Sequence, residues 1–312
     1  MVSDLTPRDA LSSTLIELGR SNPNIILLDA DFGTASKIWA FKKHFPDRYI
    51  QLGVAEQNMM GVAAGLSTVG FIPFASTLAV FCSRRACDQV TVAIGLSRTN
   101  VKIVGIYAGI FAGKNGATHQ SLEDIAIMRA IANMVVVQPA DAIETEQVIR
   151  YAAEYDGPMY IRIGRDPMPS HLPPGYHFEL GKSVTLKDGK DVTMMVYGDL
   201  VDETMKAASL LLDRGIDARV INMSSLKPID EEAITKAAEE TGKIVTIDNH
   251  SVYGGLGSAV AEVVTETCPV KVKKIGIHNI FGKSGSNEEM KKAFGFRAED
   301  IANEVFGFVQ TK

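Results

Sequence analysis

The chain has 312 residues, which is long enough for two domains that each bury a hydrophobic core. A formal net charge of −5 gives no broad basic surface, which argues against nucleic acid as the main partner, although small anions can bind locally. Three cysteines are too few and too unevenly spaced for a disulfide framework or a zinc site, which favours a reducing cytoplasm. The N-terminus has no apolar run, so no signal peptide is predicted.

Strands and helices alternate along the first half of the chain. Thr6-Pro7-Arg8-Asp9 combines a cap, a first-turn proline and an early acid, and predicts a helix that runs to about Gly19. The predicted strands cover 24–29, 50–53, 71–74, 101–107, 134–138 and 159–163. A helix is predicted over 55–66, and capping boxes at Ser121 with Asp124 and at Asp141 with Glu144 predict two more. This alternation predicts a doubly wound, parallel, six-stranded sheet.

The segment 57–83 carries no charge and is long enough to raise the question of a membrane span. Gly61, Gly65, Gly70 and Pro73 interrupt it, so we interpret it as a buried helix, a turn and a buried strand, with no membrane contact.

A proline-rich linker separates the second half, which is a smaller α/β domain. Five proline and glycine residues fall between 165 and 176, and we place the domains at 1–168 and 186–312 with a linker at 169–185. The predicted strands lie near 191–197, 217–222, 243–248 and 271–277, and the helices near 200–214, 230–240 and 256–266. The glycines of 254–257 open the last helix and indicate a tight turn rather than a nucleotide site.

Glu56 is a carboxylate in an otherwise uncharged stretch. It falls in the first turn of a helix that follows a strand, at the edge of the sheet where open α/β folds place ligands. Spacing alone also fits an acid that complements the helix dipole.

Three short blocks of the sequence, one of which contains Glu56, resemble a known family. Gly53-Val54-Ala55-Glu56-Gln57-Asn58-Met59, Asn115-Gly116-Ala117-Thr118-His119-Gln120 and Gln138-Pro139-Ala140-Asp141 resemble consecutive blocks of the transketolase family, in order and at similar spacing. The similarity runs from about Thr6 to Arg165 and continues weakly to the C-terminus. The chain therefore resembles the C-terminal half of a transketolase, or the matching subunit of a split one.

The resemblance implies thiamine diphosphate as cofactor. It assigns to Glu56 the hydrogen bond to the aminopyrimidine that activates the cofactor. It places Phe81 against the pyrimidine, with Leu78 and Arg84 at positions where other members often have aromatic residues. Asp31 matches a family aspartate near the thiazolium ring.

The resemblance also implies the substrate contacts. His119 matches a histidine that faces the oxygens of the substrate and can donate a proton. Arg8 and Arg165 match arginines that hold a sugar phosphate, and a guanidinium suits that role because it grips two anionic oxygens. For each arginine, an ordinary solvated side chain is the alternative.

Two departures concern the donor sugar. Lys114-Asn115 stands where the family usually carries an acid, and Tyr107 replaces a family histidine. Because those positions contact hydroxyl groups of the donor, the resemblance predicts an unusual ketose, or one that carries a different anionic group.

The motif that binds Mg²⁺ and the diphosphate in thiamine enzymes, Gly-Asp-Gly followed by an asparagine, is absent from the sequence. We therefore expect a separate N-terminal subunit to carry the Mg²⁺ ligands, with two copies of each subunit in a cytoplasmic heterotetramer that acts on sugar phosphates in carbohydrate metabolism such as the pentose phosphate pathway.

Three alternatives stay open. The first two are a deoxyxylulose-phosphate-synthase-like protein and the β subunit of a 2-oxo acid dehydrogenase. The third is a non-catalytic binding subunit, against which the retention of Glu56 and His119 counts.

Overall fold

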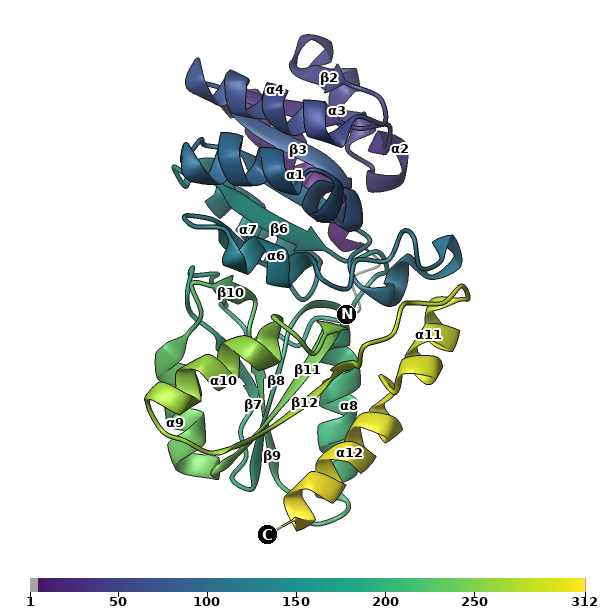
Figure 1. Cartoon of the computed structure of the whole chain (residues 1–312), viewed down its shortest axis with the longest axis vertical. Helices are drawn as coiled ribbons and strands as arrows, with labels where there is room; N and C mark the ends of the chain where they lie inside the picture. Colours follow the sequence, from purple (N-terminus) through teal and green to yellow (C-terminus); the bar gives the residue numbers. More distant parts are fainter. Residues whose placement is uncertain (1–4, 312) are drawn as a thin grey trace.

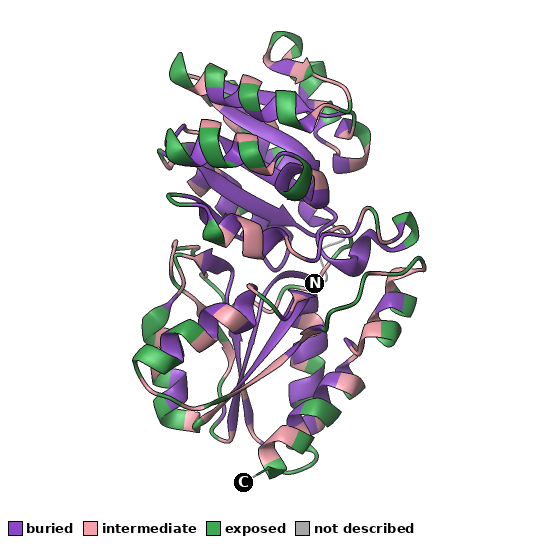
Figure 2. Cartoon of the chain, in the orientation of Figure 1, coloured by how far each residue is buried: buried purple, intermediate pink, exposed green. Residues whose placement is uncertain are grey.

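The computed structural model describes residues 5–311 and shows two α/β halves stacked along the long axis (Figure 1). The chain up to the end of β6 (Met159–Ile163) forms one half, and most of the remainder forms the other. The central strands of both sheets are largely buried, and the exposed residues lie mainly on the outer helices and loops (Figure 2).

Six strands of the first half lie parallel in the order β5-β6-β4-β3-β1-β2, so the predicted six-stranded parallel sheet is confirmed. Besides β6, they are β1 (Ile25–Asp29), β2 (Tyr49–Gln51), β3 (Ile72–Leu78), β4 (Lys102–Ile106) and β5 (Val135–Val137). Successive residues of β1 belong to different core clusters, because Ile26 and Leu28 pack on one face of the sheet and Leu27 on the other. Both faces are therefore covered, as a parallel sheet requires.

A seventh strand, β10 (Ser225–Lys227), comes from the second half of the chain and pairs antiparallel with β5. It lies outside the predicted elements because three residues are too few to show a periodicity.

The helices of the first half are α1 (Pro7–Ser21), α2 (Gly33–Ser36), α3 (Trp39–His44), α4 (Glu56–Thr68), α5 (Cys87–Gln89), α6 (Asp124–Ala130) and α7 (Ala142–Glu154). Short 3₁₀ turns are η1 (Pro46–Arg48) and η4 (Ile110–Asn115), and π-helical segments are η2 (Phe81–Arg85) and η3 (Val90–Leu96). Among residues 5–311, none of the helices is both long and apolar enough to cross a bilayer.

The predicted helix caps have mixed outcomes. The capping box of Thr6 and Asp9 is confirmed. Asp141 accepts a hydrogen bond from the backbone of Glu144 as predicted, but the Glu144 carboxylate bonds the backbone of Ala140 instead of completing the box. The capping box of Ser121 and Asp124 is wrong.

The failure at Asp124 has a physical reason. Helix α6 begins at Asp124 itself, and its carboxylate faces a buried arginine, Arg162, instead of the helix start. An ion pair with a buried guanidinium is a stronger interaction than a cap on a short helix.

The second sheet has the order β12-β11-β8-β9-β7, and only β7 runs antiparallel to its neighbour. Its strands are β7 (Val184–Lys187), β8 (Val192–Val196), β9 (Ala218–Asn222), β11 (Lys243–Ser251) and β12 (Lys271–Ile277). The helices are α8 (Val201–Leu212), α9 (Glu231–Thr241), α10 (Leu256–Glu266), α11 (Asn287–Phe294) and α12 (Ala298–Gln310), with a 3₁₀ turn η5 (Gly198–Leu200).

Three of these elements, β7, α11 and α12, lie outside the predicted ones. A full capping box of Ser286 and Glu289 opens α11 and was a usable signal in the sequence. The turn at 254–257 places the first N–H of α10 on the Asp248 carboxylate, at 2.8 Å. The protein's own acid therefore occupies this helix start, in agreement with the prediction of a structural turn.

The two halves share a core. One hydrophobic cluster contains Met60 and Tyr160 from the first half together with Met195, Leu226 and Ile244 from the second. The buried amide of Gln120 adds a polar link, because it donates to the carbonyls of Ile110 and Lys283. The loop that carries the second of the three blocks is thus fixed from both sides.

Candidate functional site

Glu56 is the first residue of α4 and follows β2 at the carboxyl edge of the first sheet. Its side chain is only 2% exposed, and Oε2 accepts a hydrogen bond from Nη1 of Arg85 at 2.8 Å. Among the described residues, Arg85 is the one side chain that hydrogen-bonds Glu56. The structure therefore provides a buried carboxylate with a single cationic partner at the edge where ligands bind in this fold class.

Arg85 connects Glu56 to an aromatic pair. Its guanidinium lies over the ring of Phe81, 3.9 Å from the centroid, and Phe81 meets the His119 ring edge-on at 5.3 Å. The Thr118 hydroxyl lies 2.9 Å from Nδ1 of His119. Three predicted site residues, Glu56, Phe81 and His119, are thus brought together from three separate segments of the chain.

Arg85 completes this group and was not predicted from the sequence to be a site residue. It ends the π-helical segment η2, in which Arg84 and Arg85 are exposed and Phe81 is half-buried. Such π-helical segments are common at functional sites. Two adjacent arginines at the end of an uncharged run were the available signal.

The other predicted cofactor contacts occupy different surroundings. Arg84 points to Glu123 and forms an exposed ion pair at 2.8 Å. Leu78 is 5% exposed and belongs to the core beneath the sheet edge. Asp31 is exposed, has a φ of +58°, and its backbone N–H donates to the Gln51 side chain. None of these contacts joins the three residues to Glu56, and their cofactor roles remain predictions.

Arg8, Tyr107 and Arg165 form a second group. Both guanidinium groups lie over the Tyr107 ring, at 5.3 and 4.9 Å from its centroid. Arg8 donates from Nη1 to the Tyr107 hydroxyl at 3.0 Å and to the Ala35 carbonyl, and from Nε to the Arg165 carbonyl. The two predicted phosphate-binding arginines are therefore neighbours.

Tyr107 adopts a φ of +58°, a conformation that non-glycine residues rarely take. The ring of Phe32 packs edge-on against it at 5.2 Å. Residues held in such conformations concentrate at ligand sites, where the surrounding contacts enforce them. This position therefore supports a specific role for the tyrosine.

Asn115 and Lys114 are exposed at the end of η4 and belong to neither group. The adjacent Gly116 packs against Ser284 of the second half. Hydrogen bonds from Ser286 lower the pKa of Glu289, and the charge of Lys114 lowers it further. The Lys114 ammonium thus lies near α11, and the donor-sugar role of this pair remains a prediction.

A buried polar network stands behind the site. Arg162 is fully buried and donates from Nε to Asp124 at 2.7 Å and from Nη1 to the side chain of Gln138 at 2.6 Å. The Tyr160 hydroxyl donates to the same Asp124 oxygen at 2.6 Å. Burial raises the pKa of Asp124, but the charges of Arg162 and His250 bring it below its ordinary value.

Two residues of the third block, Gln138 and Asp141, have partners within the fold. Gln138 accepts a hydrogen bond from Arg162, and Asp141 caps α7, so both residues have structural partners. Arg162 also donates to the Asn249 carbonyl of β11, which ties the first sheet to the second half.

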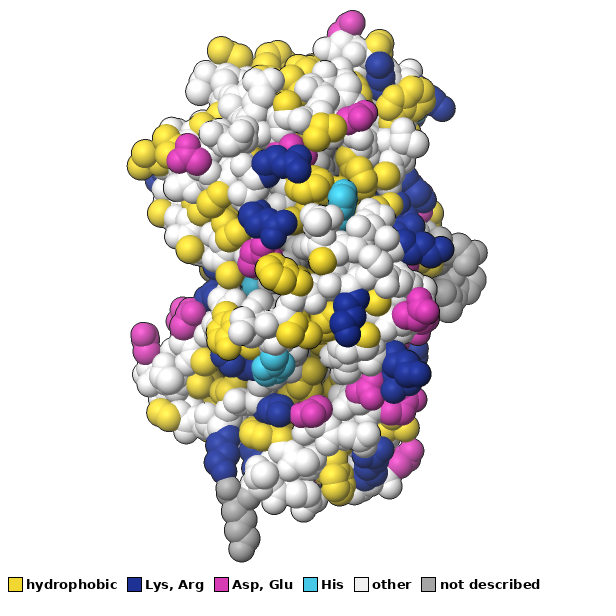
Figure 3. Space-filling model, turned by 45° about the vertical axis from the view of Figure 1, so that its right-hand side comes forward, with side chains coloured by type: hydrophobic (Ala, Val, Ile, Leu, Met, Phe, Trp, Pro, Cys, Tyr) yellow, Lys and Arg dark blue, Asp and Glu magenta, His cyan; other side chains and the backbone are white. Residues whose placement is uncertain are grey.

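Charged groups on the surface are mixed. In the face shown in Figure 3, basic and acidic side chains alternate among hydrophobic ones without a continuous basic area. Within residues 5–311, no three His, Cys, Asp or Glu side chains are grouped so that they could hold a metal ion.

Two family models match the chain and together cover most of it. Residues 3–170 match the transketolase pyrimidine binding domain, and residues 181–301 match the transketolase C-terminal domain.

Individual proteins match over nearly their whole length. A protein named as the C-terminal section of a transketolase in Methanocaldococcus jannaschii is 44% identical, over 96% of this chain and 94% of its own. The 6-deoxy-6-sulfo-D-fructose transketolase subunit SqwH of Clostridium sp. (strain MSTE9) is 42% identical, over 98% and 95%. A solved structure described as a split gene transketolase, inactive beta4 tetramer, is 46% identical with a TM-score of 0.90, over 97% of this chain and 98% of that one.

Proposed function

The chain belongs to the transketolase family, and on that premise we propose that it is the C-terminal subunit of an enzyme that depends on thiamine diphosphate. The enzyme transfers a two-carbon ketol unit from a ketose donor to an aldose acceptor. The observation that carries the proposal is the buried Glu56 carboxylate at the start of α4, beside Phe81 and His119.

A planar group with N–H donors fits between Glu56 and Phe81. The Arg85 guanidinium is such a group, and it both donates to the carboxylate and lies over the ring. The aminopyrimidine of thiamine diphosphate is likewise flat and carries hydrogen-bonding nitrogens. When bound, the cofactor supplies the nucleophilic carbon that attacks the ketose carbonyl.

Two residues of this chain, Glu56 and His119, can hold or transfer protons in that reaction. Glu56 would hold a proton toward the pyrimidine of the bound cofactor, and its burial would keep water from competing for that bond. His119 has Nδ1 engaged by Thr118, which leaves Nε2 to donate to or accept from a substrate oxygen.

Arg8 and Arg165 bind the anionic end of the substrate. Arg8 uses Nε and Nη1 for carbonyls and for the Tyr107 hydroxyl, so its position is fixed. Arg165 lies over the Tyr107 ring and supplies the second guanidinium. Because the name of one relative specifies a sulfonated fructose, we propose a ketose that ends in phosphate or sulfonate.

A partner subunit supplies the rest of the site. We assign the ligands of Mg²⁺ and the diphosphate to an N-terminal subunit, because the motif that holds them is missing from this sequence. The relatives named as a section or a subunit support this division, as does the split-gene structure. The assembly we propose contains two copies of each chain. We keep 1–168, 169–185 and 186–312 as the proposed domain division, although β7 of the second sheet begins at Val184.

Mixing the two chains tests the proposal. We expect the purified chain with Mg²⁺ and thiamine diphosphate to show no ketol transfer, and addition of the partner to produce it. Robust transfer by the single chain would contradict the division of the site. A mixed assembly that binds the cofactor but turns over no ketose would instead favour a non-catalytic subunit.

Two substitutions test donor selection in the assembled enzyme. Arg165→Ala should weaken all anionic donors together, because it removes a general anion contact. Asn115→Asp should change the ratio of kcat/KM between donors that differ at one hydroxyl. We expect the change to correspond to about 1 kcal/mol of free energy, the scale of one hydrogen bond. An unchanged ranking of donors in Asn115→Asp would remove this position from donor selection.

A further inference from the structure

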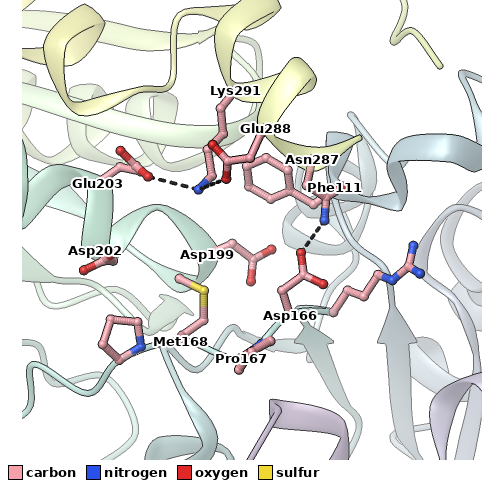
Figure 4. Close-up of a pocket in the computed structure, with 12 residues that line it drawn as sticks. Phe111, Asp166, Pro167, Met168, Asp199, Asp202, Glu203, Asn287, Glu288 and Lys291 are labelled. Carbon is pink, nitrogen blue, oxygen red and sulfur yellow. Dashed lines mark hydrogen bonds and ion pairs between the residues drawn. The ribbon is translucent and has the colours of Figure 1, made fainter. Parts of the chain in front are cut away.

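A cavity of about 230 Å³ lies between the two halves of the chain (Figure 4). Its walls come from the segment 165–169 after β6, from η5 and the start of α8, and from α11, with Phe111 of η4 beside them. Five carboxylates and two basic side chains line it, so the cavity is acidic although it lies near the arginines of the proposed substrate site.

Three of the five carboxylates are already paired. Glu203 and Glu288 both contact the Lys291 ammonium, at 3.0 and 2.9 Å. Asp202 lies 2.9 Å from His171 and 2.7 Å from Lys206. Each of these three carboxylates therefore already has a side-chain partner within the chain.

Asp199 and Asp166 are different. Asp199 is only 8% exposed, and its Oδ2 is buried without a hydrogen-bond partner among the described residues. One Asp166 oxygen accepts a hydrogen bond from the Asn287 amide. In Figure 4 the Asp199 carboxylate lies beside that of Asp166, and the charge of Asp166 acts on Asp199.

The placement of Asp199 is built into the fold. Gly164 at the end of the first sheet lies directly against Oδ1, and any side chain at that position would collide with it. Burial raises the pKa of Asp199 to about 6, with Arg162 opposing and Asp166 adding to the shift. A buried carboxylate oxygen without a hydrogen-bond partner is costly, which makes a ligand that donates hydrogen bonds favourable there.

We propose that this cavity binds a small organic cation with a primary ammonium group, held between Asp199 and Asp166. An ammonium group donates three hydrogen bonds in freely chosen directions and can serve both carboxylates at once. A divalent metal ion fits less well, because Mg²⁺ requires converging oxygen ligands in near-octahedral geometry and the described residues form no cluster of that kind. The proposal does not depend on ketol transfer.

Calorimetric titration of the full chain with 1,4-diaminobutane at constant ionic strength tests it. We expect saturable binding to one site at pH 8, no binding of tetramethylammonium, which lacks N–H donors, and no competition from MgCl₂. Equal binding of all three cations would overturn the proposal, because it would indicate charge screening alone. So would an absence of saturable binding of the diamine.

Variants locate the site. Asp199→Asn should weaken the binding of 1,4-diaminobutane at least tenfold, and Asp166→Asn, at an exposed position, should weaken it severalfold. Asp213→Asn, just after the other end of α8, is the matched control and should bind like the unaltered chain. If Asp199→Asn does not fold, Asp166→Asn decides the question. Undiminished binding in Asp166→Asn would then place the diamine elsewhere.

Discussion

At the scale of single residues, Glu56 is a buried carboxylate that hydrogen-bonds one side chain, Arg85. Glu56→Gln keeps the size and the burial of the side chain but cannot hold a proton for the pyrimidine. We expect turnover of the assembled enzyme to fall by about 10²-fold or more at saturating cofactor, with the unfolding midpoint close to that of the unaltered chain. Glu239→Gln, on the exposed face of α9, serves as the control. Near-normal turnover in Glu56→Gln would reject Glu56 as the activating acid.

Arg85 and Arg84 are adjacent arginines with different surroundings, which makes them a matched pair. Arg85 is the partner of a carboxylate that is 2% exposed, whereas Arg84 and Glu123 are both more than a third exposed. We expect Arg85→Ala to lower the free energy of unfolding by about 1–3 kcal/mol, because it leaves a buried acceptor unpaired. Arg84→Ala should cost at most about 1 kcal/mol. Urea unfolding of both variants measures the difference, and equal losses would show that Glu56 does not depend on Arg85.

The sequence indicated the members of this group better than the contacts among them. Glu56 and His119 stand out because each lies in a block that resembles the transketolase family, and the roles predicted for them come from that resemblance. Arg85 lies in no such block, and its contact with Glu56 joins η2 to α4 across 29 residues of the chain. Contacts between segments far apart in the chain depend on tertiary packing, which spacing along a sequence does not encode.

At the scale of elements, the start of α1 could be predicted from the sequence, whereas the capping box predicted for α6 was wrong. The cap of α1 is local and was predictable from Thr6 and Asp9, because both partners lie within one turn. The start of α6 is decided by Arg162 in a strand 38 residues away, which takes the Asp124 carboxylate that the spacing assigns to a cap. The strands were predictable because burial on both faces leaves continuous apolar runs. The short strand β10 has no such run.

The pairing of α6 with β6 through Asp124 and Arg162 leads to a stability prediction. Asp124→Asn should lower the free energy of unfolding at pH 7 by about 3–5 kcal/mol, because it leaves a buried guanidinium without its counter-ion. Asp88→Asn, an exposed acid in α5, is the control. Replacing both partners, as in Asp124→Leu with Arg162→Met, should be less damaging than the single change.

The lowered pKa of Asp124 sets the pH dependence of this effect. The ordinary value is 3.8 and the folded value lies below it, so the unfolded chain binds the proton more readily. The stabilisation by Asp124 is therefore complete well above pH 4 and is lost as the pH falls through the folded pKa. Urea unfolding of the unaltered chain and of Asp124→Asn should be measured between pH 7 and pH 3. The difference between their free energies of unfolding should become smaller as the pH falls. A difference that grows at low pH would contradict the assignment.

At the scale of the whole molecule, the shared core predicts cooperative unfolding. Chains with two sheets often unfold in two steps, because each half has a core of its own. Here one cluster draws side chains from both halves, and the buried Arg162 crosses from β6 to β11. We expect the halves to unfold together.

The single tryptophan makes this measurable. Trp39 lies in α3 of the first half, so its fluorescence reports that half alone, whereas far-UV circular dichroism reports both. The two thermal transitions should coincide within error. Gln120→Ala removes the hydrogen bonds to Ile110 and Lys283 but leaves the shared core, so it should lower the midpoint and keep the transitions coincident. Separation of the two curves in the unaltered chain would show that the shared core is too weak to couple the halves, and separation only in Gln120→Ala would assign the coupling to that amide.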